Sequence, residues 1–103
     1  MVFIETPIFT KKITEFITDE SYKDLQQILL FNPEEGKIIK NANGIRKIRW
    51  KLPKQGKRGS LRIIYYYKVI SDRIYMLYVY SKKEQKDLTA KQKKILGNTI
   101  NGL

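Results

Sequence analysis

The chain has 103 residues, 42% of them hydrophobic and 12% aromatic, with 21 Lys and Arg against 10 Asp and Glu and a net charge of +11. This size fits one domain over residues 1–103 with one core. Without Cys or His, the chain has no disulfide, no cysteine nucleophile and no histidine acid or base. It has no apolar run of about 18 residues and no signal-peptide pattern, so we expect a cytoplasmic protein without a membrane partner.

The first third of the sequence predicts one short strand and two helices. Residues 2–5 read as the strand, and Thr6-Pro7 supplies a hydroxyl N-cap with proline at the first helical position. A second helix begins near Thr18 and ends at Asn32-Pro33, because the residue before proline is disfavoured in helical geometry. Apolar residues recur at helical spacing and are expected in the core: Phe9, Ile13, Phe16, Ile17, Tyr22, Leu25, Ile28 and Leu29.

The middle of the chain predicts two strands around a basic loop. From Lys47 to Leu52 apolar and basic residues alternate, which is typical of a strand with one apolar and one cationic face. Residues 53–60 are rich in Gly and charge and read as a loop. From Leu61 to Ile70 a second strand places Arg62 and Lys68 on one face.

A hairpin turn at Ser71-Asp72 leads to a third strand, from Ile74 to Tyr80, with Ile74, Met76, Tyr78 and Tyr80 on one side. A last helix begins near Thr89, whose spacing to Gln92 fits a capping box. The predicted fold is therefore α+β, in the order β-α-α-β-β-β-α, with an antiparallel sheet. We expect the helices on one face of that sheet and an open basic face on the other.

The net charge lies in one window of the sequence. Between Gly36 and Ser71 there is no acidic residue, and the remaining ten basic residues equal the ten acidic ones. A block of this kind favours a polyanionic partner, because each phosphate that is neutralised releases counterions. The window holds these basic residues: Lys37, Lys40, Arg46, Lys47, Arg49, Lys51, Lys54, Lys57, Arg58, Arg62 and Lys68.

These residue types permit phosphoryl chemistry on RNA. A two-metal nuclease needs several convergent carboxylates, and the basic window supplies none. In RNA the 2′-hydroxyl is an internal nucleophile, so cleavage needs in-line positioning, charge stabilisation on the phosphorane oxygens and two proton transfers. Arg binds those oxygens bidentately, a Lys crowded by cations can act as a base, and Tyr can stack on a base or relay a proton.

Four segments, taken in order, resemble the RelE superfamily, and most closely its HigB-like toxins of type II toxin–antitoxin modules. The segments read NPEEG at 32–36, GIRKIR at 44–49, GKRGSLRIIYY at 56–66 and YSKKEQKDLT at 80–89. The resemblance covers nearly the whole chain and implies the compact α+β fold of that family. It also implies a ribosome-dependent mRNA endoribonuclease that arrests translation, with no cofactor and no metal. Its implied partners are mRNA, the ribosome and a cognate antitoxin, in such pairs commonly a helix-turn-helix protein.

The resemblance also implies roles for particular residues. Arg62 and Lys83 would act on the phosphate oxygens and the leaving 5′-oxygen, and either Lys47 or Arg49 would orient or deprotonate the 2′-hydroxyl. Some members have a catalytic Tyr where this chain has Thr89, so a stacking role must come from another residue, for which Tyr80 is a candidate. The candidate catalytic set is Lys47, Arg49, Arg62, Tyr80, Lys82 and Lys83. The candidate RNA-binding set is Arg46, Lys51, Lys54, Lys57, Arg58, Tyr66 and Lys68, with Lys54, Lys57 and Arg58 gripping ribosomal RNA.

Two other functions fit the composition. A non-catalytic RNA- or DNA-binding module of the same shape would need only the basic face. A peripheral membrane protein would use the same cations against anionic lipid, but here they lie on predicted strands and loops rather than on an amphipathic helix. Substitution of Arg62 separates the first of these from a nuclease, because a nuclease loses cleavage far more than affinity.

Overall fold

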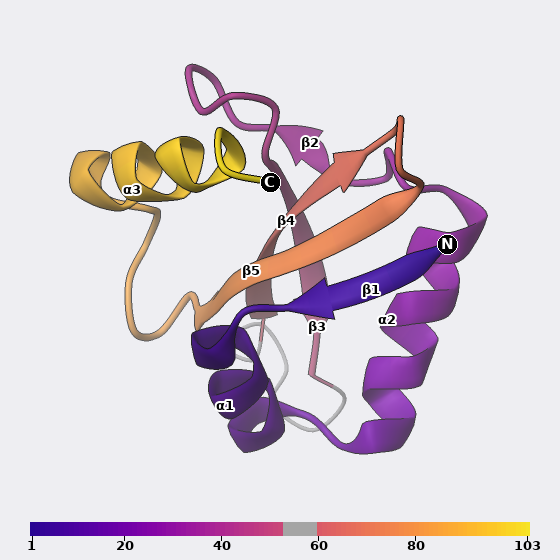
Figure 1. The fold of residues 1–103 in the computed structure, drawn as a ribbon. Helices are drawn as coiled ribbons and strands as arrows, with labels where there is room; N and C mark the ends of the chain where they lie inside the picture. The colour runs from indigo at the N-terminus through magenta and orange to yellow at the C-terminus, as the bar shows by residue number, and fades with distance from the viewer. Residues whose placement is uncertain (53–59) are drawn as a thin grey trace.

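The computed structural model describes residues 1–52 and 60–103 and shows three helices around one mixed sheet (Figure 1). The elements in chain order are β1 (Val2–Glu5), α1 (Pro7–Phe16), α2 (Asp19–Phe31), β2 (Lys37–Ile38), β3 (Arg46–Lys51), β4 (Ser60–Lys68), β5 (Arg73–Ser81) and α3 (Ala90–Ile100). The sheet order is β1-β5-β4-β3-β2. No helix in the described ranges is long and apolar enough to cross a membrane.

The helix boundaries follow the predicted caps. The Thr6 hydroxyl oxygen accepts from the amide of Phe9 at 3.1 Å, and Pro7 occupies the first turn of α1. The hydroxyl of Thr18 caps α2 in the same way, and α2 ends at Asn32. Thr89 and Gln92 form the complete capping box of α3. The α+β fold class and these helix ends are therefore confirmed.

The sheet differs from the prediction in two strands. β1 pairs with β5 in parallel, so the sheet is mixed rather than wholly antiparallel. The two-residue strand β2 pairs with the start of β3 and was not predicted, because two residues are too few to show alternation. The hairpins β3–β4 and β4–β5 are antiparallel as expected.

The helices cover both faces of the sheet, which corrects the expectation that they share one. Helices α1 and α2 pack on the face that carries Ile48, Ile63 and Met76. The last residues of α3 pack on the opposite face, where Ile100 joins a second core with Ile64, Tyr75 and Tyr80. Helical periodicity identifies an apolar side of a helix but not the face of the sheet that it meets. The basic face is therefore open only where α3 does not cover it (Figure 1).

A bulge in β5 overturns the expected grouping of its side chains. Ile64 pairs with Tyr78 and Tyr65 pairs with Met76, so Leu77 is the extra residue in the ladder. An extra residue reverses the alternation beyond it. Met76 consequently points into the first core and Tyr80 into the second, on the same face as Arg62.

Tyr65 fastens the end of α2 to the sheet, and we expect its hydroxyl to matter for stability. The buried hydroxyl donates to the carbonyl of Pro33 at 2.8 Å and accepts from the amide of Gly36 at 2.8 Å. Tyr65→Phe leaves the buried amide of Gly36 and the partly buried carbonyl of Pro33 without this partner and should lower the free energy of unfolding by about 1–3 kcal/mol. Urea unfolding measures this, and Tyr67→Phe, whose hydroxyl makes no hydrogen bond within the described residues, is the control. Equal losses in the two variants would contradict this role.

Candidate nucleic-acid interface

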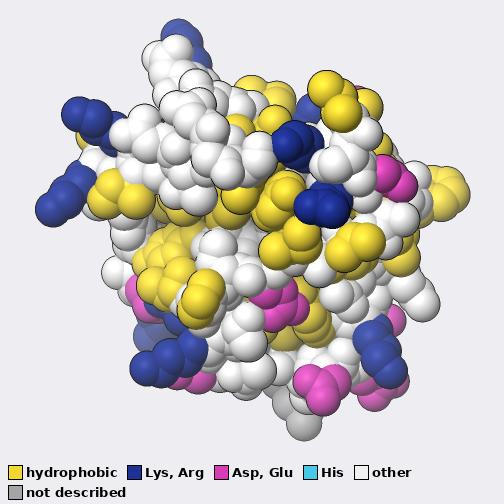
Figure 2. Space-filling view, viewed as in Figure 1, with side chains coloured by type: hydrophobic (Ala, Val, Ile, Leu, Met, Phe, Trp, Pro, Cys, Tyr) yellow, Lys and Arg dark blue, Asp and Glu magenta, His cyan; other side chains and the backbone are white. Residues whose placement is uncertain are grey.

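Antiparallel register gathers cations on the open part of the sheet. Lys47 lies opposite both Lys37 of β2 and Ile64 of β4, while Arg49 lies opposite Arg62. Residues directly opposite one another project to the same face of a sheet. We call this set the cationic cluster: Lys37, Lys47, Arg49, Lys51 and Arg62. In the view of Figure 2, several acidic side chains lie in the region of α1 and α2.

Arg62 is the buried member of the cationic cluster. Arg62 is only 6% exposed, and its guanidinium donates to the hydroxyl of Ser60. None of the three ion pairs among the described residues involves Arg62. A buried charge without a counter-charge is costly, and an anionic ligand would offset that cost. Arg62 is therefore a candidate anion-binding group.

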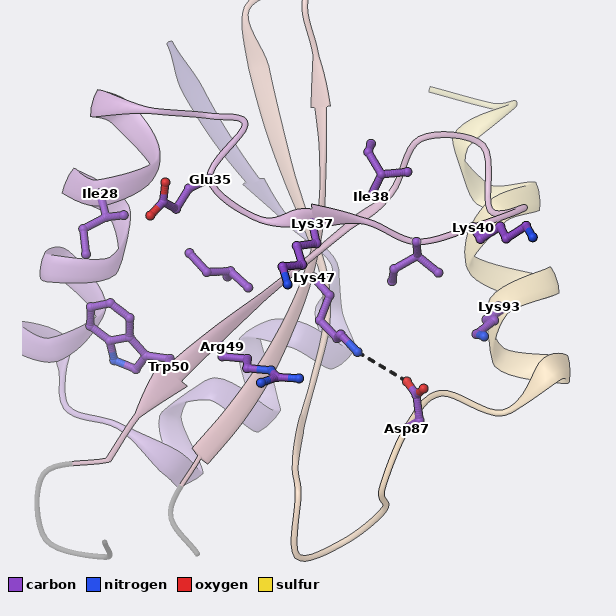
Figure 3. A pocket seen from close by; sticks show the side chains of 12 residues that line it. Ile28, Glu35, Lys37, Ile38, Lys40, Lys47, Arg49, Trp50, Asp87 and Lys93 are labelled. Carbon is purple, nitrogen blue, oxygen red and sulfur yellow. Dashed lines mark ion pairs between the residues drawn. The ribbon is translucent and has the colours of Figure 1, made fainter. Parts of the chain in front are cut away.

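A groove of about 540 Å³ runs beside the cluster, along the β2–β3 edge of the sheet (Figure 3). Its cationic walls come from Lys37, Lys47 and Arg49, and its apolar walls include Ile38 and Trp50. The Trp50 ring is held by a bond from its Nε1 to the hydroxyl of Ser21 at 3.2 Å. Cations beside an aromatic wall are the combination that binds single-stranded nucleic acid, through phosphates and base stacking.

Two acidic side chains, Glu35 and Asp87, line the groove, and sequence reasoning missed the contribution of Asp87. Asp87 lies in the loop between β5 and α3, and its Oδ1 is 3.6 Å from Nζ of Lys47 (Figure 3). The amide of Leu88 donates to the same carboxylate at 2.8 Å. That bond, followed by the charges of Lys47 and Lys93, lowers the pKa of Asp87. The sequence shows Asp87 in the segment at 80–89, but its contact with Lys47 joins residues far apart in the chain.

Tyr80 lies beneath the cluster rather than on its surface. Its side chain is fully buried, and its hydroxyl has no hydrogen-bond partner among the described residues. Burial, followed by the charge of Asp87, raises the pKa of Tyr80 to about 12, against the opposing charge of Arg62. No face of the ring is open to a nucleotide, which corrects the expectation that Tyr80 stacks on a base. The hydroxyl stays protonated at neutral pH, and the charges of both Arg62 and Asp87 act on it.

Lys82 and Lys83 lie in the turn after β5, at the same end of the sheet as Lys51. The amide of Lys82 donates to the carbonyl of Ser60 at 3.1 Å, so this turn lies next to the first residue of β4. Both lysine side chains are exposed. The predicted catalytic lysines thus border the cluster at its open end.

Three of the predicted RNA-binding residues lie away from the cluster. Arg46 donates to the carbonyls of Glu34 at 3.1 Å and Gly36 at 2.7 Å, and so holds the segment between α2 and β2. Tyr66 stacks on Tyr75 with ring centroids 6.4 Å apart. Lys68 donates to the carbonyl of Leu103 at 2.6 Å. Tyr66 and Lys68 share the face of Arg62 but lie about 13 and 20 Å farther along β4.

Lys54, Lys57 and Arg58 fall in residues 53–59, outside the described residues. Within residues 1–52 and 60–103, no three acidic side chains lie close enough together to hold a metal ion.

No family model matches this chain. Among solved structures, the chain is similar to an arginine-to-alanine double mutant of the E. coli toxin RelE in the free state, with a TM-score of 0.58 and 13% sequence identity. The match covers 82% of this chain and 86% of that one. At this identity the likeness shows the fold, and the chain accordingly has a RelE-like α+β fold.

Proposed function

We propose that this chain is the toxin of a type II toxin–antitoxin module, of the HigB-like branch, and that it cleaves mRNA on the ribosome and so inhibits translation. The proposal rests on the RelE-like fold together with one observation, the buried Arg62 in the middle of the cationic cluster, which forms no ion pair among the described residues. A surface that only needed solubility would not bury an arginine without a counter-charge. A phosphate of the substrate supplies that charge.

The reaction that suits the cluster is attack of the 2′-hydroxyl on the adjacent phosphorus. A 2′-O–P bond forms, the P–O5′ bond breaks, one proton leaves the 2′-hydroxyl and one reaches the 5′-oxygen. Arg62 and Arg49, which lie opposite each other on β4 and β3, bind the non-bridging oxygens and stabilise their growing charge. Lys47 orients the 2′-hydroxyl, and Lys82 and Lys83 at the open end of the sheet face the leaving oxygen.

The groove beside the cluster would hold the bases and phosphates next to the cleaved bond. Trp50 and Ile38 offer apolar contact, and Lys37 and Lys51 offer charge. The proposed partners are mRNA, ribosomal RNA surfaces and a helix-turn-helix antitoxin, and the proposed location is the cytoplasm. No cofactor or metal takes part in this mechanism.

The chemistry of the RNA ends tests the mechanism. Attack by the 2′-hydroxyl leaves a 2′,3′-cyclic phosphate and a 5′-hydroxyl, whereas a two-metal nuclease activates water and leaves a 5′-phosphate or a 3′-phosphate. We expect cyclic ends on mRNA cut in a purified translation system, and no cutting at a site that carries a 2′-deoxy nucleotide. Tight RNA binding without any cleavage would instead support the non-catalytic module.

Asp87 should weaken RNA binding, because its carboxylate occupies Lys47 in the free protein. Asp87→Asn removes this charge and keeps an oxygen that can accept from the amide of Leu88. We expect affinity for a 2′-O-methyl RNA to rise several-fold. The slope of the logarithm of the binding constant against the logarithm of the salt concentration should steepen by about 0.7. This is the value for one further phosphate bound on a single strand. Fluorescence anisotropy over a series of salt concentrations measures both quantities.

Glu84→Gln is the matched control for Asp87→Asn, since Glu84 lies in the same loop but pairs with Lys12 at 3.3 Å, outside the groove. Equal increases in affinity in the two variants would mean that the effect comes from the change in net charge alone, and would contradict the role of Asp87 in the site.

A further inference from the structure

A second groove, of about 450 Å³, lies between the segment before β3 and the side of α3. The residues that shape it are Lys40, Asn41, Asn43, Lys93, Lys94 and Asn98, and no acidic side chain lines it. Lys40 and Lys93 also line the first groove, so the two grooves adjoin at these side chains. Figure 3 shows Lys40 and Lys93 beside α3, beyond the Lys47–Asp87 pair.

The wall of the second groove is fixed rather than loose. Asn41, Asn43 and Gly44 have positive φ angles of 60°, 58° and 93°, which define a tight turn. The side-chain amide of Asn43 donates to the carbonyl of Gly97 at 2.7 Å. Ala42, between the two asparagines, is buried in the core that α3 covers. The turn is thus held against α3 through Asn43 and Ala42.

The lysines along this groove lie where positive charge destabilises α3. The first turn of α3 has no acidic residue, and Lys91, Lys93 and Lys94 lie in its N-terminal half. Cations there add to the positive end of the helix dipole, whereas acidic residues would offset it. The ion pairs among the described residues use none of Lys40, Lys93 and Lys94. Asp87 is the acidic residue whose charge Lys93 feels, at the junction with the first groove. The second groove is therefore polar and carries net positive charge.

We propose that the second groove binds the phosphodiester backbone of the same RNA strand, a few nucleotides away from those held at the cationic cluster. This inference rests on the proposed function and extends it to a longer footprint. Lys40 and Lys93 contact the RNA where the two grooves meet, and Lys94 binds a phosphate at the far end of the second groove. Asn41 and Asn98 donate to phosphate or sugar oxygens. An RNA that spans both grooves is held by side chains that a short RNA cannot reach.

The experiment compares two non-cleavable 2′-O-methyl RNAs, of about 4 and about 12 nucleotides, which lie near the lower end and in the upper half of the site sizes of compact single-strand-binding domains, about 4–16 nucleotides. The variant is Lys94→Glu with Asn98→Asp, two exposed positions that line the second groove alone. Its control is Lys91→Glu with Thr99→Asp, which makes the same change in net charge on the same helix outside the groove. Both are measured by fluorescence anisotropy at low salt.

We expect the groove variant to bind the longer RNA about tenfold more weakly than the control does. Its salt dependence should be shallower by about 0.7 for each phosphate that the variant no longer binds. Binding of the shorter RNA should be equal in the two variants. If the groove variant and the control bind the longer RNA equally, the second groove does not bind RNA. The proposed function still stands in that case, provided that the wild-type protein binds the shorter RNA. Failure of the wild-type protein to bind either RNA would count against the proposed function itself.

Discussion

Arg62→Lys is expected to lower the single-turnover rate of mRNA cleavage on the ribosome by about 10²–10³-fold, the usual cost of removing one donor from a transition-state oxyanion. Lysine keeps the positive charge but loses the planar fork that binds two phosphate oxygens together. The loss should therefore fall mainly on the rate of the chemical step. Quenched-flow cleavage of a programmed ribosome, with the toxin in excess, measures that rate.

Binding of the Arg62→Lys protein to the ribosome should change little, because the exposed cations around the groove are intact. Arg62 is buried, so circular dichroism and a urea titration must first show that the variant is folded. Arg46→Lys is the control, since Arg46 holds the segment before β2 through carbonyl groups and does not line the groove. A cleavage rate close to that of the wild-type protein in Arg62→Lys would contradict the central role of this guanidinium.

Lys47→Met should lower the cleavage rate by about 10²-fold, the loss that misplacing a reacting group by about 1 Å can cause. Methionine keeps much of the length of the side chain and removes its ammonium group, so the groove is disturbed little. The expected signature is a slower chemical step that higher toxin concentration does not restore. Single-turnover rates over a range of toxin concentrations measure this.

Lys37→Met is the matched control, because Lys37 lies directly opposite Lys47 in the register of β2 and β3 and lines the same groove. Its loss should weaken binding and leave the maximal rate near that of the wild-type protein. Identical behaviour of the two variants would mean that Lys47 contributes only charge to binding.

The cationic face itself was predictable from the sequence. The window without acids located the charge, and the alternation from Lys47 to Leu52 separated Lys47 and Arg49 from the core. Antiparallel pairing with the next strand then brings Arg62 to the same face. The same alternation places Arg46, two residues before Ile48, on the face of Ile48. The sequence pattern therefore already indicated that Arg46 lies on the other face from Lys47 and Arg49.

The parts that were not predictable depend on contacts between distant segments. Periodicity cannot say which face of the sheet receives α3, nor that the loop before it brings Asp87 to Lys47. The bulge at Leu77 reverses the alternation in β5 without a glycine or proline to mark it, and this reversal buries Tyr80 beneath Arg62. Tyr66 and Lys68 share the correct face, but their distance along β4 removes them from the cluster.

The most direct test of the proposed function is cleavage of an mRNA in a purified translation system, with and without ribosomes, by the wild-type protein and by Arg62→Ala. We expect cuts that require ribosomes, and that disappear in a variant that still folds and binds. Intact mRNA in every reaction, with RNA and ribosome binding unchanged between the two proteins, would contradict the proposed function and leave a basic binding module with a RelE-like fold.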